Sequence, residues 1–493
     1  MKIVVRDFMD MHPKHIHCAS DYYYVRVANE LNQVIRFVTK GGVEEDILAD
    51  VALKLALYLE DVVSEAGIWD AFVELHRRMY DRPLPFYDVH AGYSASDMTE
   101  ENVSFLIWLF MMNGYEGQRI LNPDNPGMHE MAKAVLLVLQ KYRKKAPVNE
   151  DLLDLLYGDE TLEDFMEVKH VLIWLSDQCY LSEWVGTMVL VNDLVDKLEE
   201  SFPSMSYGKR EYMARSIYAF AHKGTLLAML PQQWYAEMLR GYNADEFAGI
   251  ARDIEDIAFR NFGVYHVEGC DDVHIRLTDT EGKPLQLCRD SVDSGFSSKS
   301  LDTHKVLLTA MAQWKSEWQM VGMSSWLQDE RVYHDAVEEL HAPKDNLTVL
   351  PPELIGKLGG RRLFFFKDYA ALHSWTNELL GTACAKTDKG HLREMKDILV
   401  FIEDNGAMSI TPDGACGVKA ADNPLYSPAK APTEALRLLL STESTTAGMS
   451  RYLVENGLLA DACLNSMVSP ERGRQLVQEN MDFLARCLRR CSY

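Results

Sequence analysis

The feature that most constrains the fold of this chain is a change in hydrophobic period near residue 264. Before that point apolar residues recur at helical spacing, as in residues 44–65, whose apolar side chains share one face. From Val264 to Leu327 the spacing changes to the alternation typical of β-strands, interrupted by tight-turn residues. This change predicts a compact β unit inserted between two mainly helical bodies.

Two hairpins are predicted inside the β segment. The first pairs residues 273–277 with 285–287 across a turn that ends near Gly282, and the second pairs 306–314 with 318–322. About five short strands in one such segment are typical of a small antiparallel barrel of the SH3-like or OB-like kind.

The part of the chain before residue 264 is predicted to be helical. Its apolar spacing and helix-stop residues predict helices over 44–65, 68–80, 103–112, 125–145 and 162–200, the last as one long or two stacked helices. Asn243 and Glu246 have the spacing of a capping box, which predicts a further helix that ends near Gly263.

The last third of the chain mixes both periods. A strand at 362–366 leads into a helix at 368–380, and Asn405-Gly406 predicts a hairpin between 397–402 and 407–411. Helices are expected again at 433–440, around Tyr452 and at 470–490. The sequence thus predicts an α+β, predominantly helical protein. We divide it into an N-terminal all-α domain (1–262), a small antiparallel β-barrel-like domain (263–328) and a C-terminal α+β domain (329–493).

The charge balance excludes two classes of partner. The chain has 50 basic and 74 acidic residues and a formal net charge of −24. Strong binding to nucleic acid or to a membrane surface requires clustered positive charge, so we expect neither as a partner. Arg486, Arg489 and Arg490 lie where a last helix would end, and a favourable interaction with the dipole of that helix accounts for them.

Cysteine usage and apolar runs bear on the compartment. The nine cysteines are scattered without a Cys-x-x-Cys pair, unlike the clustered, even set of a secreted disulfide framework. The first residues lack the pattern of a secretory signal, and the longest apolar run, 105–112, is far shorter than the roughly 20 residues of a membrane span. We therefore expect a reduced, soluble, cytoplasmic protein.

Several core-like and turn-like runs distinguish the chain. They are Ser20–Asn29, Glu60–Phe86, Asn102–Phe110, the set Trp314, Trp318 and Gly322, and the run Asn423-Pro424-Leu425-Tyr426. These runs resemble a family of uncharacterised proteins of Bacteroidetes-type bacteria, a domain of unknown function. The resemblance covers most of the chain and is best in the first third. It implies a bacterial cytosolic protein and carries no activity or substrate with it.

Common catalytic motifs are absent from the sequence. It contains no nucleophile elbow, no phosphate-binding or dinucleotide-binding glycine loop, and no His-Glu-x-x-His helix. Glu167-x-x-His170 and Glu338-x-x-His341 have the spacing of a metal-binding pair, but they lie on opposite sides of the β segment, and chance explains them better. We interpret His76 and His170 as partly buried partners of backbone or carboxylate groups.

Histidines are dense near the start of the chain. His12, His15, His17 and Cys18 fall within seven residues, a density that suits zinc or copper. Pro13 breaks the local helix and no second ligand pair follows at finger spacing, so we interpret the segment as a solvent-exposed turn. The sequence therefore predicts no metal and no cofactor.

Aromatic residues gather in the β segment. They are Tyr265, Trp314, Trp318 and Trp326. An exposed aromatic groove on a small barrel recognises extended peptides, because flat rings bury area at a low entropic cost. The alternative is that these rings fill the interface between the barrel and the helical body.

Two functions follow from these patterns. The first is a non-enzymatic protein that binds a protein or peptide partner through the four aromatic residues above. The alternative is a hydrolytic enzyme of unrecognised type, with or without a metal, whose site lies between the helical and C-terminal domains. Such an enzyme requires a concave site with at least two titratable groups of displaced pKa.

The irregular segment 411–432 is a second candidate pocket. Its polar residues Asp413, Asp422, Asn423 and Tyr426 are able to line a site, because long irregular loops within compact chains are often functional. Ordinary turn chemistry at Asn423 is the alternative, and we favour it.

Overall fold

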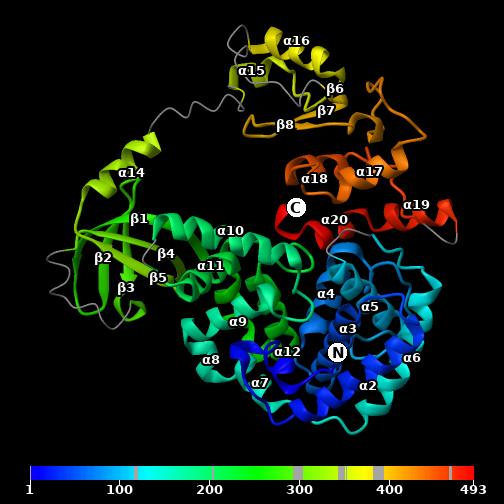
Figure 1. Ribbon diagram of the computed structural model, residues 1–493. Helices are drawn as coiled ribbons and strands as arrows, with labels where there is room; N and C mark the ends of the chain where they lie inside the picture. The colour runs from blue at the N-terminus through cyan, green and yellow to red at the C-terminus, as the bar shows by residue number, and fades with distance from the viewer. Residues whose placement is uncertain are drawn as a thin grey trace. The chain divides into compact units, whose positions relative to one another are not determined.

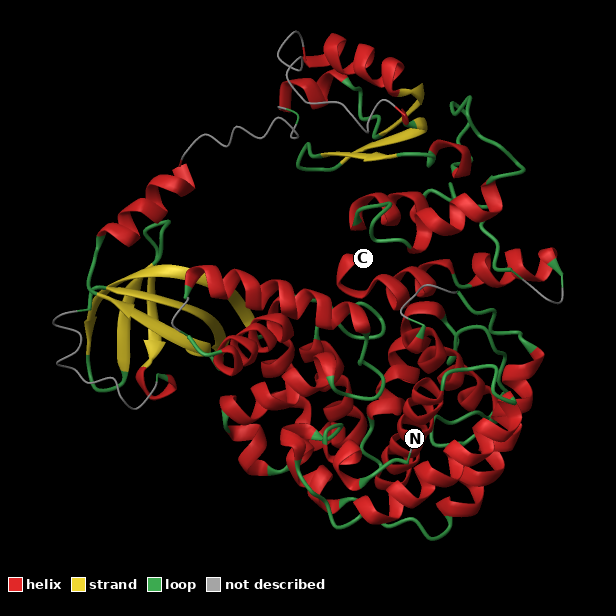
Figure 2. Cartoon of the chain, viewed as in Figure 1, coloured by secondary structure: helices red, strands yellow, loops and turns green. Residues whose placement is uncertain are grey.

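The computed structural model describes residues 2–115, 120–202, 205–292, 304–341, 350, 352–380, 394–465 and 469–493. It confirms a mainly helical α+β protein with a small closed barrel and a second, smaller sheet (Figures 1 and 2). The chain divides into two compact units. The first comprises Met1–Arg119 and Gly127–Pro343, and the second comprises Ile120–Pro126 and Lys344–Tyr493.

The helical body forms most of the first unit. Its helices are α1 (Val5–Met9), η1 (Pro13–His15), α2 (Asp21–Thr39), α3 (Glu45–Ser64), α4 (Ile68–Tyr80), α5 (Glu100–Gly114), α6 (Pro126–Arg143), α7 (Glu150–Tyr157), α8 (Asp159–Glu163), α9 (Phe165–Asp177), α10 (Val185–Ser201), α11 (Tyr207–Ala221) and α12 (Pro231–Glu255). The predictions for α3 and α4 are confirmed almost to the residue. Helix α5 is apolar on every side and is buried from Asn102 to Asn113, as a central core helix must be.

The start of α4 shows how distant residues position local structure. Gly67 occupies its N-cap and has no side chain that accepts a hydrogen bond. The carboxylate of Asp61 in α3 instead accepts the backbone N–H groups of Ile68 at 3.1 Å and Trp69 at 2.8 Å. Burial raises the pKa of Asp61 to about 7. This buried cap fixes the corner between α3 and α4.

Three helix predictions differ from the structure at polar break points. The segment 162–200 contains the end of α8, then α9 and α10, because Asp164 caps a new helix by accepting the Met166 N–H at 2.8 Å. Asn243 caps as predicted and accepts the Glu246 N–H at 3.3 Å, but it kinks the continuous α12, which ends at Glu255. The predicted helix 470–490 is broken at Asn480.

The barrel has five strands. They are β1 (Ala258–Cys270), β2 (His274–Thr278), β3 (Pro284–Cys288), β4 (Val306–Trp314) and β5 (Glu317–Leu327), in the closed order β1-β2-β3-β5-β4. Both predicted hairpins are present. The barrel is mixed rather than purely antiparallel, because β3 and β5 pair in parallel at Leu287 and Trp318. The structure therefore confirms a small closed barrel and corrects its predicted purely antiparallel pairing.

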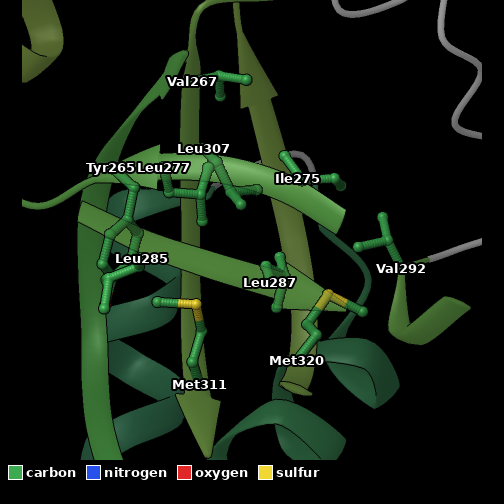
Figure 3. Packing of buried hydrophobic residues seen from close by; sticks show 10 residues of the cluster. All are labelled: Tyr265, Val267, Ile275, Leu277, Leu285, Leu287, Val292, Leu307, Met311 and Met320. Carbon is green, nitrogen blue, oxygen red and sulfur yellow. The ribbon is translucent and has the colours of Figure 1, made fainter. Parts of the chain in front are cut away.

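Alternate residues of each strand fill the barrel (Figure 3). Ile275 and Leu277 of β2 face Leu285 and Leu287 of β3 across the antiparallel ladder, in the registers Ile275 to Leu287 and Leu277 to Leu285. The other core members are Tyr265, Val267, Val292, Leu307, Met311 and Met320. This two-residue period is the signal that predicted the strands.

The barrel packs directly on the helical body. Helix α11 contacts both β5 and β1 (Figure 1). The Phe220 ring stacks on Phe259, with centroids 5.7 Å apart. Gly322 of β5 has φ +80°, and a Cβ atom there would lie 3.2 Å from Met213 Cγ, so only glycine permits this approach. Helix α14 (Arg331–His341) covers part of β1.

The second unit is built on an antiparallel sheet of order β6-β7-β8. Its elements are β6 (Leu363–Asp368), β7 (Lys396–Ile402), β8 (Met408–Thr411), α15 (Pro352–Lys357), α16 (Tyr369–Leu380), η5 (Ala415–Gly417), α17 (Ala431–Leu440), α18 (Ala447–Glu455), α19 (Pro470–Glu479), α20 (Met481–Arg489) and η6 (Arg490–Ser492). Leu372 of α16 packs on Phe364, Ile398 and Val400 of the sheet. The predicted strand, hairpin and helix order of this region is confirmed.

The two arginines at the end of α20 differ in how well they fit the prediction that they interact with the end of their own helix. Arg489 and Arg490 are fully buried. The Arg489 guanidinium donates to the backbone carbonyl oxygens of Ser441 at 3.0 Å and Thr445 at 2.6 Å, just beyond the end of α17. Arg489 thus binds carbonyl groups that follow the neighbouring α17, whereas Arg490 Nε donates to the Cys487 carbonyl oxygen in the last turn of its own helix at 2.9 Å, as the dipole interpretation predicts.

Within the described part of the chain, no helix combines the length and the apolar character that a membrane crossing demands.

Candidate functional site

The four aromatic residues predicted to form a binding face all lie on strands of the barrel. Tyr265 and Trp314 are each only 4% exposed. Tyr265 lies in the barrel core, and the Trp314 ring packs against Phe165 of α9 with centroids 6.3 Å apart. These two rings serve packing, as the interface alternative predicts for Trp314, and neither is available to a peptide.

Trp318 and Trp326 are half-buried at the edges of the barrel core. The Arg260 guanidinium lies 5.3 Å from the Trp318 ring centre and donates to Asp279 at 2.7 Å, so a cation of the chain already covers this ring. The two tryptophans are eight positions apart on β5, a span of up to about 26 Å in extended chain. Tyr265 belongs to the barrel core cluster and Trp318 and Trp326 pack against it, so the four predicted residues do not form one exposed aromatic groove.

Within the described residues, the Glu-x-x-His pairs form no group of metal-ligating side chains. Glu167 of α9 forms an ion pair with Lys14, and His170 is half-buried with a pKa lowered by burial and by Lys169. Glu338 is exposed on α14, and the His341 side chain lies outside the described residues.

The segment 411–432 is organised by turn chemistry. The side-chain amide of Asn423 is buried and donates to the carbonyl oxygens of Ala415 and Val418, each at 2.7 Å. The Tyr426 hydroxyl donates to Asp461 at 2.5 Å. Asp413 and Asp422 are exposed, and Asp422 pairs with Arg361. The turn alternative accounts for Asn423.

His76 is a buried partner of the backbone, as predicted. Its side chain is fully buried in the helical body, and Nδ1 lies 2.8 Å from the carbonyl oxygen of Arg82, to which it donates. Burial lowers the pKa of His76 from 6.5 to about 4.

This burial predicts a pH effect on stability. Below pH 6.5 the unfolded chain protonates His76 while the folded chain does not, so stability falls as the pH drops toward 4. The loss from this group reaches about 3 kcal/mol. In urea unfolding at pH 7 and pH 4.5, His76→Gln should lose less stability on acidification than the wild type. The exposed His15→Gln should behave as the wild type, and identical pH responses of both variants would contradict the assignment.

A cleft of about 670 Å³ opens in the helical body between the end of α3, α4, the segment 93–96 and α12. Its apolar floor contains the buried side chains of Val62, Ala71, Val73 and Met238. Its walls are polar and mostly acidic. The charged residues that line it are Glu65, Asp70, Glu74, Arg77 and Glu237.

Two of these acids already have cationic partners. Arg77 donates to Glu74 at 2.8 Å, and Arg78 donates to Glu237 at 2.7 Å. In the parts of the chain that the structure describes, neither Glu65 nor Asp70 forms an ion pair. Burial raises the pKa of Asp70, and the negative charge of Glu65 raises it further. These two carboxylates give the cleft its uncompensated negative charge.

The corner between α3 and α4 brings Glu65 and Asp70 together. Glu65 ends α3 in the left-handed region at φ +56°, and Gly67 follows at φ +76°. A Cβ atom on Gly67 would lie 3.2 Å from the Tyr157 hydroxyl, so this position requires glycine. Asp70 then falls in the first turn of α4, where the helix dipole favours its negative charge.

Aromatic side chains complete the walls of the cleft. Tyr242 is 44% exposed and stacks on Tyr157 with ring centroids 3.9 Å apart. The Tyr93 hydroxyl donates to Asn102 Oδ1 at 2.9 Å, and burial raises the pKa of Tyr93. The cleft thus offers carboxylates and ring faces within one concave surface.

Comparison with known protein families identifies the family of this chain. The family described as "Protein of unknown function (DUF3843)" matches residues 2–258 and 295–490. The chain belongs to the DUF3843 family. The DUF3843 match contains every residue that lines the cleft, and it leaves out most of β1 and all of β2 and β3. No curated protein and no solved structure matches the chain. The bacterial source implied by the sequence resemblance stays a prediction.

Sequence reasoning missed the cleft of this DUF3843 protein. Glu65 and Asp70 lie in the run Glu60–Phe86, which was recognised only as core-like and turn-like. The Glu65-Ala66-Gly67 helix stop was visible, but α12, which supplies Glu237, is more than 150 positions away in the sequence. No local sequence motif predicts that these distant helices line one cleft.

Proposed function

We propose that this protein binds a small organic cation, bearing an amine or guanidinium group, in the acidic cleft. The observation that carries the proposal is the pair Glu65 and Asp70, which lines a concave surface without an ion-pair partner among the described residues. A bound cation would supply the missing positive charge and relieve the repulsion between the two carboxylates.

The dimensions and chemistry of the cleft support a small ligand. A volume of about 670 Å³ falls within the range of small-molecule sites, which combine an apolar floor with a few convergent polar groups. The exposed ring of Tyr242 offers a π-face to an ammonium or guanidinium group. Because the pKa of Asp70 is raised, affinity for a cation should increase with pH as this carboxyl ionises.

The cleft changes how the two sequence-based hypotheses apply. A lysine or arginine side chain of a protein or peptide partner presents the same cation, so a peptide would dock through charge rather than through the barrel aromatics. The enzyme hypothesis requires two titratable groups of displaced pKa in one concave site, and Asp70 and Tyr93 line the cleft with raised pKa values. The second candidate function is therefore an enzyme in which Asp70 acts as a general acid.

Calorimetric titration of the full chain tests the binding proposal. We expect spermidine, agmatine or a lysine- and arginine-containing tripeptide to bind, and citrate to give no heat. Asp70→Asn and Glu65→Gln should each weaken binding about tenfold, the effect of one charge-assisted contact. Glu130→Gln is the matched control, because it removes one charge from an exposed position of α6 outside the cleft.

Two results would overturn the proposal. One is that none of the cations binds the wild-type chain. The other is that Glu130→Gln weakens binding as much as Asp70→Asn, which would show a general effect of net charge. Turnover of a bound cation that is lost in Asp70→Asn but retained in Glu130→Gln would favour the enzyme instead.

A further inference from the structure

A second polar cluster, none of whose ligand residues lines the cleft, is buried near the start of the chain in the helical body. His12 Nδ1 lies 3.7 Å from Cys18 Sγ and 3.7 Å from Asp21 Oδ1. One ligand atom from each residue lies within 4.8 Å of the others. The three side chains are 1%, 0% and 0% exposed. The interpretation of this segment as a solvent-exposed turn is thus wrong for His12 and Cys18, although His15 and His17 are exposed.

One oxygen of the cluster has no hydrogen-bond partner among the residues that the structure describes. Asp21 Oδ2 accepts the Cys18 N–H at 2.9 Å, but Asp21 Oδ1 is buried and accepts no hydrogen bond. This Oδ1 atom faces His12 Nδ1. A buried carboxylate oxygen that loses its hydration without gaining a partner is costly, so such an atom points to a ligand.

The opposite side of the His12 ring is held by a carboxylate. His12 Nε2 lies 2.8 Å from Glu60 Oε2, and the other Glu60 oxygen accepts from Asn149 at 2.9 Å and Ser20 at 3.3 Å. A carboxylate on the far nitrogen is the usual outer partner of a metal-binding histidine, because it fixes the ring and leaves the near nitrogen for the ion.

We propose that His12 Nδ1, Cys18 Sγ and Asp21 Oδ1 bind a zinc ion. Zinc takes nitrogen, sulfur and oxygen donors together, and tetrahedral bonds of ordinary length place such donors about 3.4–3.6 Å apart. The observed separations of 3.7 Å are close to these values. Because all three ligands are buried, the ion would be structural, connecting the loop 12–18 to α2 and, through Glu60, to α3.

The local chain path explains why these ligands meet. Pro13 starts the short helix η1, and Lys14 and His15 adopt left-handed φ values of 56° and 53°. The chain therefore reverses direction within a few residues and returns Cys18 to His12. Asp21 follows as the first residue of α2.

A proton on His12 is the competing occupant of this position. Burial opposes the charged imidazolium, but Glu60 and Cys18 together outweigh it and raise the pKa of His12 to about 10. A protonated Nδ1 facing Asp21 is the arrangement expected if no metal binds, so the experiment must detect coordination itself.

Cobalt titration of the chelator-stripped full chain tests the proposal. We expect one Co²⁺ per chain, a thiolate-to-cobalt charge-transfer band and the visible bands of tetrahedral geometry, all removed by added Zn²⁺. Cys18→Ser should abolish the charge-transfer band, and Asp21→Asn should weaken binding at least tenfold. Cys179→Ser is the control, because Cys179 is a buried cysteine of the same body outside the cluster and should leave the band unchanged.

A measurement on the wild type keeps the test decisive if a variant fails to fold. X-ray absorption of the zinc-loaded chain should count one sulfur in the zinc shell. Absence of a thiolate band with Co²⁺, a zinc shell without sulfur, or an unchanged band in folded Cys18→Ser would overturn the proposal.

Discussion

Replacing Arg489 with alanine should destabilise the protein by about 4 kcal/mol, the loss expected when several buried hydrogen bonds to one charged group are removed. The guanidinium is fully buried and donates to the carbonyl oxygens of Ser441 and Thr445 and to the Thr445 hydroxyl, at 2.6 to 3.0 Å. Without it the Thr445 carbonyl and hydroxyl and the Ser441 carbonyl each lose a charge-assisted hydrogen bond, and a cavity is left. Urea unfolding monitored by circular dichroism measures the change.

Two further variants sharpen this test. Arg489→Lys keeps the charge but not the planar fork of donors, so it should recover only part of the lost stability. Arg474→Ala removes a partly exposed arginine whose pair with Glu471 spans 3.4 Å, and it should change stability by less than about 1 kcal/mol. If Arg489→Ala costs no more than Arg474→Ala, the buried fork does not stabilise the second unit.

Trp314→Ala should cost about 3–5 kcal/mol, the range for truncating a large buried aromatic residue. Its ring is 4% exposed and packs on Phe165, so the substitution opens a cavity between the barrel and α9. Trp318→Ala should cost less than half as much, because that ring is half-buried at the barrel edge. Denaturant unfolding of both variants provides the comparison.

The outcome separates packing from recognition. A large loss for Trp314→Ala and a small loss for Trp318→Ala would confirm that Trp314 belongs to the core. Equal, small losses would contradict this assignment and restore the aromatic binding hypothesis for the barrel.

Patterns within one element predicted the fold best. The alternation of Ile275, Leu277, Leu285 and Leu287 predicted the first hairpin because the two strands are adjacent in the chain. The parallel pairing of β3 with β5 was not predictable, since strand neighbours in space need not be neighbours in sequence. The start of β1 at Ala258 was missed because the change of period becomes visible only from residue 264.

The sites depended on contacts that the sequence does not display. His12 and Cys18 look exposed beside Lys14 and His15, but both are buried, and His12 contacts Glu60, which is 48 positions away from it. The sequence shows that aromatic residues are concentrated in the β segment, but composition cannot distinguish a ring in a core from a ring in a groove. The burial of Tyr265 and Trp314 is set by the closed barrel and by α9.

The close approach of β5 to α11 makes the barrel and the helices thermodynamically interdependent. A gene fragment that ended at Glu255 would encode a protein in which Met213, Phe165 and Phe220 had lost their cover, an apolar patch of the kind that drives aggregation. Any shortened version intended for biochemical work should therefore retain the strands through Leu327, even though most of β1 and all of β2 and β3 lie outside the family match.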